Sequence, residues 1–329
     1  MNSLAKIFAV GSLVCASAAA FAAQRDADTY PTRPIRLMVP QNPGASVDNI
    51  SRILAARMGE ELGQQIVADN RPGAGGTLAA EVVAHAVPDG QTLFAVATGT
   101  AVISPQTFKK LAYDPIKDFE YISLFAITQN VLVVHPSLPV KTVRELIILA
   151  KKEPGKLNFG SPGSASGNRL EMEVFRKTAG IEMTHIPYKG GAGPAVTALV
   201  SGETQLMFTT LSSVVQFVKA LRLRALAVTS PARAAVLPDV PTTTELGITE
   251  LVGGSWQGLF FPKDTPAAII DRVFAATQKA MAEEEVKRRL AAGGVDVVIS
   301  SAPAEFTRFV VSETQKWDKA VKDSGATAD

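Results

Sequence analysis

The 329-residue sequence has a single cysteine, Cys15, and only three histidines, His85, His135 and His185. One cysteine excludes an internal disulfide and a multi-thiolate metal site. The histidines lie in separate segments without metal-ligand spacing, so we expect no metal site and no catalytic histidine. The sequence also lacks a Gly-x-Ser-x-Gly nucleophile elbow. We therefore expect a protein that is not an enzyme and that needs no cofactor.

An excess of one charge is absent as well. Lysine and arginine number 33 against 31 aspartate and glutamate residues, which gives a formal net charge of +2. The basic residues form no block interleaved with aromatics, so a nucleic-acid partner is not expected. There is no heptad repeat, low-complexity tract or long linker. The 47% hydrophobic content is ample for the cores of two domains.

The amino terminus has the features of a secretory signal peptide. Lys6 supplies the positive charge, and the apolar run that begins at Ile7 is shorter than the ~20 residues of a membrane-spanning helix. Ala20-Phe21-Ala22 is a small-x-small cleavage signal. We predict that residues 1–22 are removed and that the mature protein, which then has no cysteine, is periplasmic.

The rest of the chain alternates short apolar strands with helices. The strand Ile35–Val39 precedes a helical pattern, and the strand Thr92–Ala97 follows a second one. This order predicts a mainly parallel, doubly wound α/β sheet. Joins near residues 127–130 and 253–257 separate two runs of such units. We expect two lobes joined by two crossing strands, with lobe 1 formed by 30–127 and 257–329 and lobe 2 by 128–256.

Three strand-to-helix loops are rich in small polar residues and poor in charge: 40–48, 98–104 and 160–168. In the first loop, Ser46 is predicted as the N-cap of the following helix. Backbone N–H groups at a helix start form a seat for an anion such as a carboxylate. Each loop by itself is explained by turn chemistry. Because ligands bind at the carboxyl ends of strands in doubly wound sheets, the three together favour a ligand cleft.

The glycine loop Asn70-Arg71-Pro72-Gly73-Ala74-Gly75-Gly76 has a different interpretation. It is similar to a nucleotide-binding loop, but Leu78 occupies the place of the third glycine in Gly-x-Gly-x-x-Gly. Gly-Lys-Ser/Thr is also missing, so phosphate binding is not expected there.

Several motifs in fixed order resemble the Bug receptor family, the extracytoplasmic solute-binding proteins of tripartite tricarboxylate transporters. The resemblance spans residues 30–325. Its main motifs are Pro40-x-x-Pro43-Gly44-x-Ser46-x-Asp48, the glycine loop at 70–76, Pro88-Asp89-Gly90-x-Thr92-Leu93, Tyr113-Asp114-Pro115-x-Lys117-Asp118-Phe119, Pro187-Tyr188-Lys189-Gly190-Gly191 and Leu237-Pro238-Asp239-Val240-Pro241-Thr242.

The resemblance implies a type II periplasmic-binding-protein fold whose two lobes close over one small organic carboxylate. It implies a monomer that delivers this ligand to a two-component membrane permease. Family members hold the carboxylate through loop backbone, small polar side chains and waters. Carried onto this chain, the ligand-binding residues are Gln41, Asn42, Gly44, Ala45, Ser46, Thr98, Thr100, Ser161, Gly163, Ser166, Asn168 and Thr209.

Three positions depart from the family pattern. Gln41 replaces a frequent aromatic residue, and Ala45 replaces a glycine, which suggests a local change in the loop backbone. Thr209 replaces an aspartate that meets a ligand's ammonium group in many relatives. The change argues against an amino-acid ligand and favours a di- or tricarboxylate or an aromatic carboxylate. A binding module that reports a carboxylate to a membrane sensor kinase is an alternative that the sequence does not separate from transport.

Overall fold

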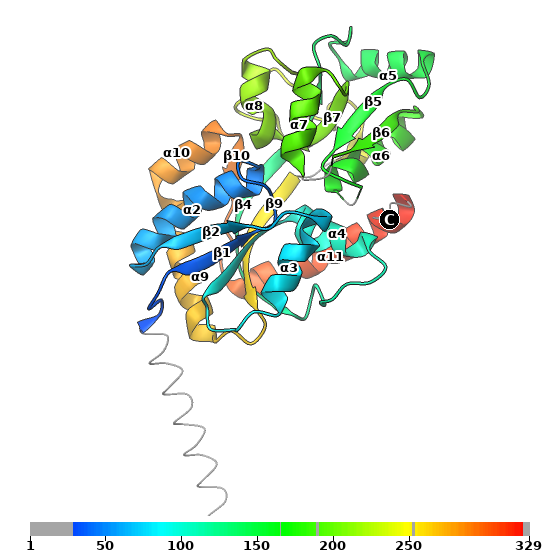
Figure 1. The fold of residues 1–329 in the computed structure, drawn as a ribbon. Coiled ribbons are helices and arrows are strands. Elements are labelled where there is room, and N and C mark those ends of the chain that lie inside the picture. The colour runs from blue at the N-terminus through cyan, green and yellow to red at the C-terminus, as the bar shows by residue number, and fades with distance from the viewer. Residues whose placement is uncertain (1–28, 165, 189–190, 252–253, 325–329) are drawn as a thin grey trace, which may run out of the picture.

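The computed structural model describes residues 29–164, 166–188, 191–251 and 254–324 (Figure 1). The predicted signal peptide at 1–22, with Cys15, lies outside these residues. Within them, no helix combines the length and the apolar character needed to cross a membrane.

The strands form a continuous sheet in the order β2-β1-β3-β9-β4-β7-β5-β6, with β10 and β8 also paired to β4. Strands β1, β2 and β3 are parallel, as are β5, β6 and β7, whereas β4 and β9 run antiparallel to their neighbours. The strands are β1 (Ile35–Val39), β2 (Ile66–Asn70), β3 (Thr92–Ala97), β4 (Phe119–Val134), β5 (Asn158–Ser161), β6 (Thr184–Pro187), β7 (Leu206–Thr210), β8 (Arg224–Val228), β9 (Gly254–Pro262) and β10 (Val295–Val297).

Two strands join the two α/β lobes, which confirms the predicted fold class. The 16-residue strand β4 pairs with β9 and β10 in lobe 1 and then with β7 and β8 in lobe 2. Strand β9 brings the chain back from lobe 2 to lobe 1. The join that the sequence placed near residues 127–130 lies inside this one continuous strand. Thr128 pairs with Ser255, and Asn130 pairs with Thr210, because backbone hydrogen bonds continue through polar residues.

Helices cover both faces of the sheet in lobe 1 (Figure 1). One face packs on α2 (Ser46–Leu62), α9 (Ala267–Ala282) and α10 (Glu284–Ala292). The other packs on α3 (Thr77–Ala84), the π-helix η2 (Gly99–Ile103), α4 (Ser104–Thr107) and α11 (Pro303–Ser324). A short 3-10 turn, η1 (Ala74–Gly76), precedes α3.

Lobe 2 carries α5 (Val143–Lys152), α6 (Gly167–Ala179), α7 (Ala192–Ser201), α8 (Leu211–Lys219) and the 3-10 turn η3 (Thr249–Leu251). Helix α5 begins with a capping box, in which the Thr142 hydroxyl accepts the Glu145 N–H at 3.1 Å. Helix α6 is capped by Ser166, whose hydroxyl accepts the Arg169 N–H at 3.3 Å.

The buried hydrophobic residues separate into four clusters. Two clusters draw on residues 30–126 and 256–321, with Leu170 as the one member from lobe 2. The other two draw on residues 131–251. Each lobe therefore has its own core on both sides of its part of the sheet. The finer lobe boundaries at 127/128 and 256/257 stay a prediction.

Candidate ligand-binding cleft

A cavity of about 580 Å³ lies between the two lobes, at the carboxyl ends of the parallel strands. Lobe 1 contributes the loops that follow β1, β2 and β3, and lobe 2 contributes the loops that follow β5, β6 and β7. The lining residues are Pro40, Gln41, Ser46, Pro72, Gly73, Ala74, Gly75, Gly76, Ala97, Thr98, Gly99, Thr100, Ile103, Ser104, Phe108, Asn130, Pro162, Gly163, Ser164, Ser166, Gly167, Asn168, Glu171, Pro187, Gly191, Ala192, Thr210, Gly254, Ser255 and Trp317.

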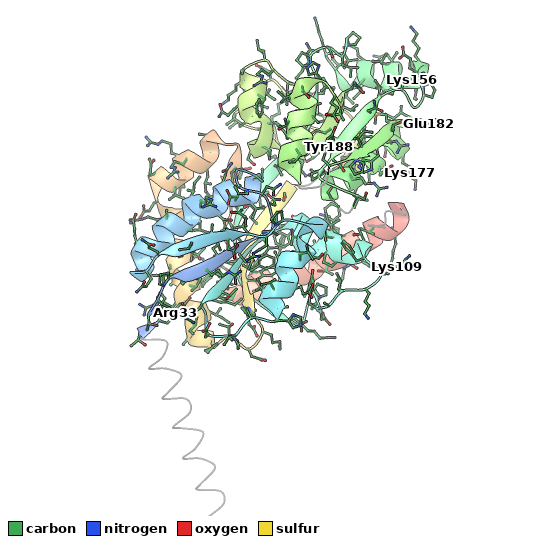
Figure 2. All side chains as sticks on the ribbon, in the orientation of Figure 1. Arg33, Lys109, Lys156, Lys177, Glu182 and Tyr188 are labelled. Carbon is green, nitrogen blue, oxygen red and sulfur yellow. The ribbon has the colours of Figure 1, made fainter. Side chains whose placement is uncertain are left out.

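Charge is scarce in this lining. Among the described residues, Glu171 is the one ionisable acidic or basic side chain that lines the cavity. Lys156, Lys177 and Glu182 instead lie along the right-hand edge of lobe 2 in Figure 2, and none of them lines the cavity. A ligand that enters the cavity therefore meets small side chains, hydroxyl groups and backbone rather than a countercharge.

The structure brings together seven of the twelve residues that the sequence assigned to the site. These are Gln41, Ser46, Thr98, Thr100, Gly163, Ser166 and Asn168. The other five do not line the cavity: Asn42, Gly44, Ala45, Ser161 and Thr209.

The first loop, residues 40–48, forms more hydrogen bonds within itself than the sequence indicated. Helix α2 begins at Ser46, and Ala45 is its N-cap residue, so the prediction of Ser46 as the N-cap is wrong. The Gln41 side chain does part of that task, because its Oε1 accepts the Val47 N–H at 3.0 Å. The left-handed conformation falls on Gly44, with φ +82°, and Ala45 is extended. The alanine therefore fits this loop without strain.

Ser46 is consequently free to face the cavity and the other lobe. Its Oγ lies 2.7 Å from the Oγ of Ser212 on α8 and 3.5 Å from the Nε2 of Gln257. The Ser46–Ser212 hydrogen bond joins lobe 1 to lobe 2 at the rim of the cavity.

The glycine loop after β2 belongs to the cavity wall, and the sequence analysis missed it. Gly73, Ala74, Gly75 and Gly76 all have positive φ. At Gly76 a Cβ would lie 2.3 Å from the Thr100 Oγ1, so only glycine fits there. Successive backbone N–H groups in a turn can form an anion-binding concavity, although the Gly76 N–H already donates to the Gly73 carbonyl at 2.8 Å. The usable signal was the position of the loop at the end of a parallel strand, not a phosphate motif.

Several hydroxyl groups in the wall already donate to protein carbonyls. Thr100 and Ser104 both donate to the Gly75 carbonyl, at 3.2 and 3.0 Å. Ser166 donates to the Gly163 carbonyl at 2.8 Å. An anion in the cavity would therefore take hydrogen bonds mainly from backbone N–H groups and from Ser46.

Ser161 stabilises the loop after β5 from inside the lobe. It is fully buried, donates to the Gly163 carbonyl at 3.0 Å, and lies 2.6 Å from the Nε2 of His185. The His185 ring stacks on Phe159, with centroids 4.9 Å apart. Burial, together with nearby arginines, lowers the pKa of His185 to about 4. Neither side chain of this serine–histidine contact lines the cavity, and the imidazole is a weak base.

Thr210, and not the predicted Thr209, faces the cavity. Thr209 is fully buried, and its hydroxyl has no hydrogen-bond partner among the described residues. Thr210, the next residue on β7, lines the cavity. Neighbouring side chains on a strand point to opposite faces, so only one of the two threonines can face the ligand.

Glu171 is the most unusual residue of the wall, and the sequence gave it no role. Its carboxyl group is 9% exposed, and Oε1 accepts a hydrogen bond from the Asn130 Nδ2 at 2.6 Å. Burial raises the pKa of Glu171 to about 7, although hydrogen bonds from Asn130 and Asn168 oppose the rise. Glu171 lies four residues after Gly167, on the same face of α6, which is the signal that would have found it.

A family model described as "Tripartite tricarboxylate transporter family receptor" matches residues 50–326. The chain belongs to this family. The resemblance to Bug receptors is confirmed: BugT of Bordetella pertussis is 33% identical over 327 residues, which cover 99% of each chain.

Two solved structures of the same fold hold carboxylates. MatC from Rhodopseudomonas palustris, with bound malate, is 32% identical, with a TM-score of 0.83 over 89% of this chain and all of that one. The R. palustris protein Rpa4515, with adipate, is 31% identical, with a TM-score of 0.87 over 91% of this chain and 99% of the other. The similarity to each relative extends over both lobes of this chain, and therefore over the residues of the cavity.

Proposed function

We propose that this receptor captures a small organic carboxylate in the periplasm by closure of its two lobes and delivers it to a tripartite tricarboxylate-type permease. The observation that carries the proposal is the cavity between the lobes, which glycine backbone and small polar side chains line almost without charge. The malate and adipate bound by two relatives support the carboxylate class.

Backbone and helix termini supply the attraction for the carboxylate. Helix α6 begins at Gly167, and the glycine loop 73–76 lies across the cavity from it. Helix starts carry a partial positive charge, and their first N–H groups have no partner within the helix. Hydrogen bonds from such groups to an ionised acceptor contribute about 1.5–3 kcal/mol each. A few of them are enough for micromolar binding without a lysine or arginine.

Closure follows if the ligand binds both lobes at once. The two sides of the cavity already meet at Ser46 and Ser212, and a Cβ at Gly167 would touch Ile103. A ligand shifts an open–closed balance only by its difference in affinity for the two states. A carboxylate that contacts lobe 1 alone would bind without closing the protein, whereas one that also contacts α6 would favour the closed form.

Calorimetry tests the proposal with the mature protein, freed of co-purified ligand, and a panel of mono-, di- and tricarboxylates and aromatic carboxylates. We expect saturable binding of at least one member and a more compact protein in small-angle X-ray scattering. Silence across the panel, with an intact unfolding transition, would contradict the proposal. Delivery is tested by carboxylate uptake in cells that contain the permease with and without the receptor.

A further inference from the structure

Two residues that line the cavity each have a buried acceptor oxygen with no hydrogen-bond donor within 3.5 Å among the described residues. These oxygens are Oε2 of Glu171 and Oδ1 of Asn130. Glu171 is 9% exposed and Asn130 is 6% exposed, so bulk solvent does not compensate them. An acceptor buried in this way destabilises the ligand-free protein until a donor reaches it.

The two side chains fix each other. The Asn130 Nδ2 donates to the Glu171 Oε1 at 2.6 Å, which uses one oxygen of the carboxyl group and orients the amide. Asn130 comes from the crossing strand β4, and Glu171 comes from α6, so the pair sits where lobe 2 meets the strands between the lobes. When Glu171 is ionised, as it is at pH 8, the two remaining oxygens form the acceptor pole of the cavity.

The rest of the lining has the opposite character. The loop at 73–76 and the start of α6 offer backbone N–H groups, which suit a carboxylate. The cavity therefore has a donor-rich part and an acceptor-rich part. A ligand that satisfies both needs a carboxylate and, elsewhere on its skeleton, a group that donates a hydrogen bond.

We propose that Glu171 and Asn130 select carboxylates that also carry a hydroxyl or ammonium donor. This rests on the proposed function and narrows its ligand class. A polycarboxylate without a donor would place a second anion against the Glu171 carboxyl group, which is unfavourable in a cavity without a basic side chain among the described residues.

Matched ligand sets test the proposal directly. Succinate, L-malate and L-aspartate share one four-carbon dicarboxylate skeleton. Succinate carries no donor group on it, malate carries a hydroxyl group and aspartate carries an ammonium group. Phenylacetate, mandelate and phenylglycine repeat the comparison on an aromatic skeleton. In at least one set we expect a donor-bearing member to bind about 10-fold tighter than the member without a donor, or better.

Two variants then test whether Glu171 causes the preference for donor-bearing ligands. Glu171→Gln keeps the shape and an acceptor oxygen but removes the charge, so an ammonium preference should be lost and a hydroxyl preference reduced. Glu171→Met removes both acceptors and should abolish either preference. Glu173→Gln is the matched control on the same helix, because Glu173 pairs with Arg176 at 2.8 Å and does not line the cavity.

The outcomes separate this proposal from the proposed function. Equal or tighter binding of succinate and phenylacetate, or a donor preference that Glu171→Met leaves intact, would overturn the selection and leave carboxylate capture standing. No binding of any carboxylate by folded protein would overturn both proposals.

Discussion

Replacing Glu171 with glutamine should stabilise the ligand-free protein at neutral and alkaline pH. Burial raises the pKa of this carboxyl group from 4.5 to about 7. Below pH 4.5 the group is protonated in both the folded and the unfolded chain, so it imposes no ionisation cost. Between pH 4.5 and 7 only the unfolded chain ionises, and the folded state loses stability as the pH rises. Above pH 7 the loss is constant.

The pKa shift of Glu171 determines how much stability the Glu171→Gln substitution should add. A pKa raised from 4.5 to about 7 corresponds to about 3 kcal/mol of unfolding free energy. Glutamine fits the same space and can still accept the Asn130 Nδ2 hydrogen bond, so it should recover most of this amount at pH 8 and almost none near pH 4.5. For a chain of this length the gain corresponds to roughly 5 °C or more in melting temperature.

Urea unfolding of both proteins at a series of pH values from 4.5 to 8 provides the measurement. His185 contributes in the opposite direction, because its lowered pKa makes the unfolded chain bind more protons below pH 6.5. That contribution is the same in both proteins and cancels in their difference. Glu173→Gln, which breaks a pair with Arg176, should instead lose up to about 1 kcal/mol at pH 8. A difference between wild type and Glu171→Gln that does not change with pH would refute the reasoning.

Three further predictions concern the cavity wall and the half-buried imidazole of His185. Ser46→Ala should weaken carboxylate binding by about 1–3 kcal/mol in calorimetry, whereas Ser51→Ala, a buried serine of the same helix that does not line the cavity, should leave affinity unchanged. Trp317 lines the cavity and Trp256 is buried behind it, so the fluorescence change on ligand binding should disappear in Trp317→Phe and persist in Trp256→Phe; the reverse result would remove Trp317 from the wall. His185 should stay neutral down to about pH 5, and an NMR titration of its ring with a midpoint near 6.5 would contradict the buried environment.

The sequence was sufficient for the order of elements and for the family, because both depend on local patterns. The apolar runs Ile35–Val39 and Thr92–Ala97 became β1 and β3 with the predicted bounds. Thr142 and Glu145 form the capping box that starts α5. The three polar loops also lie at the cavity, because the carboxyl ends of parallel strands meet at one edge of a sheet. These features follow from residue type and spacing alone.

The membership of the cavity wall was decided by tertiary structure. The sequence analysis assigned Thr209 to the ligand, whereas Thr210 lines the cavity, because a shift of one residue along β7 exchanges the buried face with the cavity face. The sequence analysis assigned Ser161 to the ligand site, whereas in the folded protein its hydroxyl contacts His185. In the sequence, Glu171 and Trp317 do not differ from other helix residues. They line the cavity only because of the way α6 and α11 pack in the folded protein. Local periodicity fixes which residues share a helix face, but only the packing of that helix against the rest of the chain determines what the face meets.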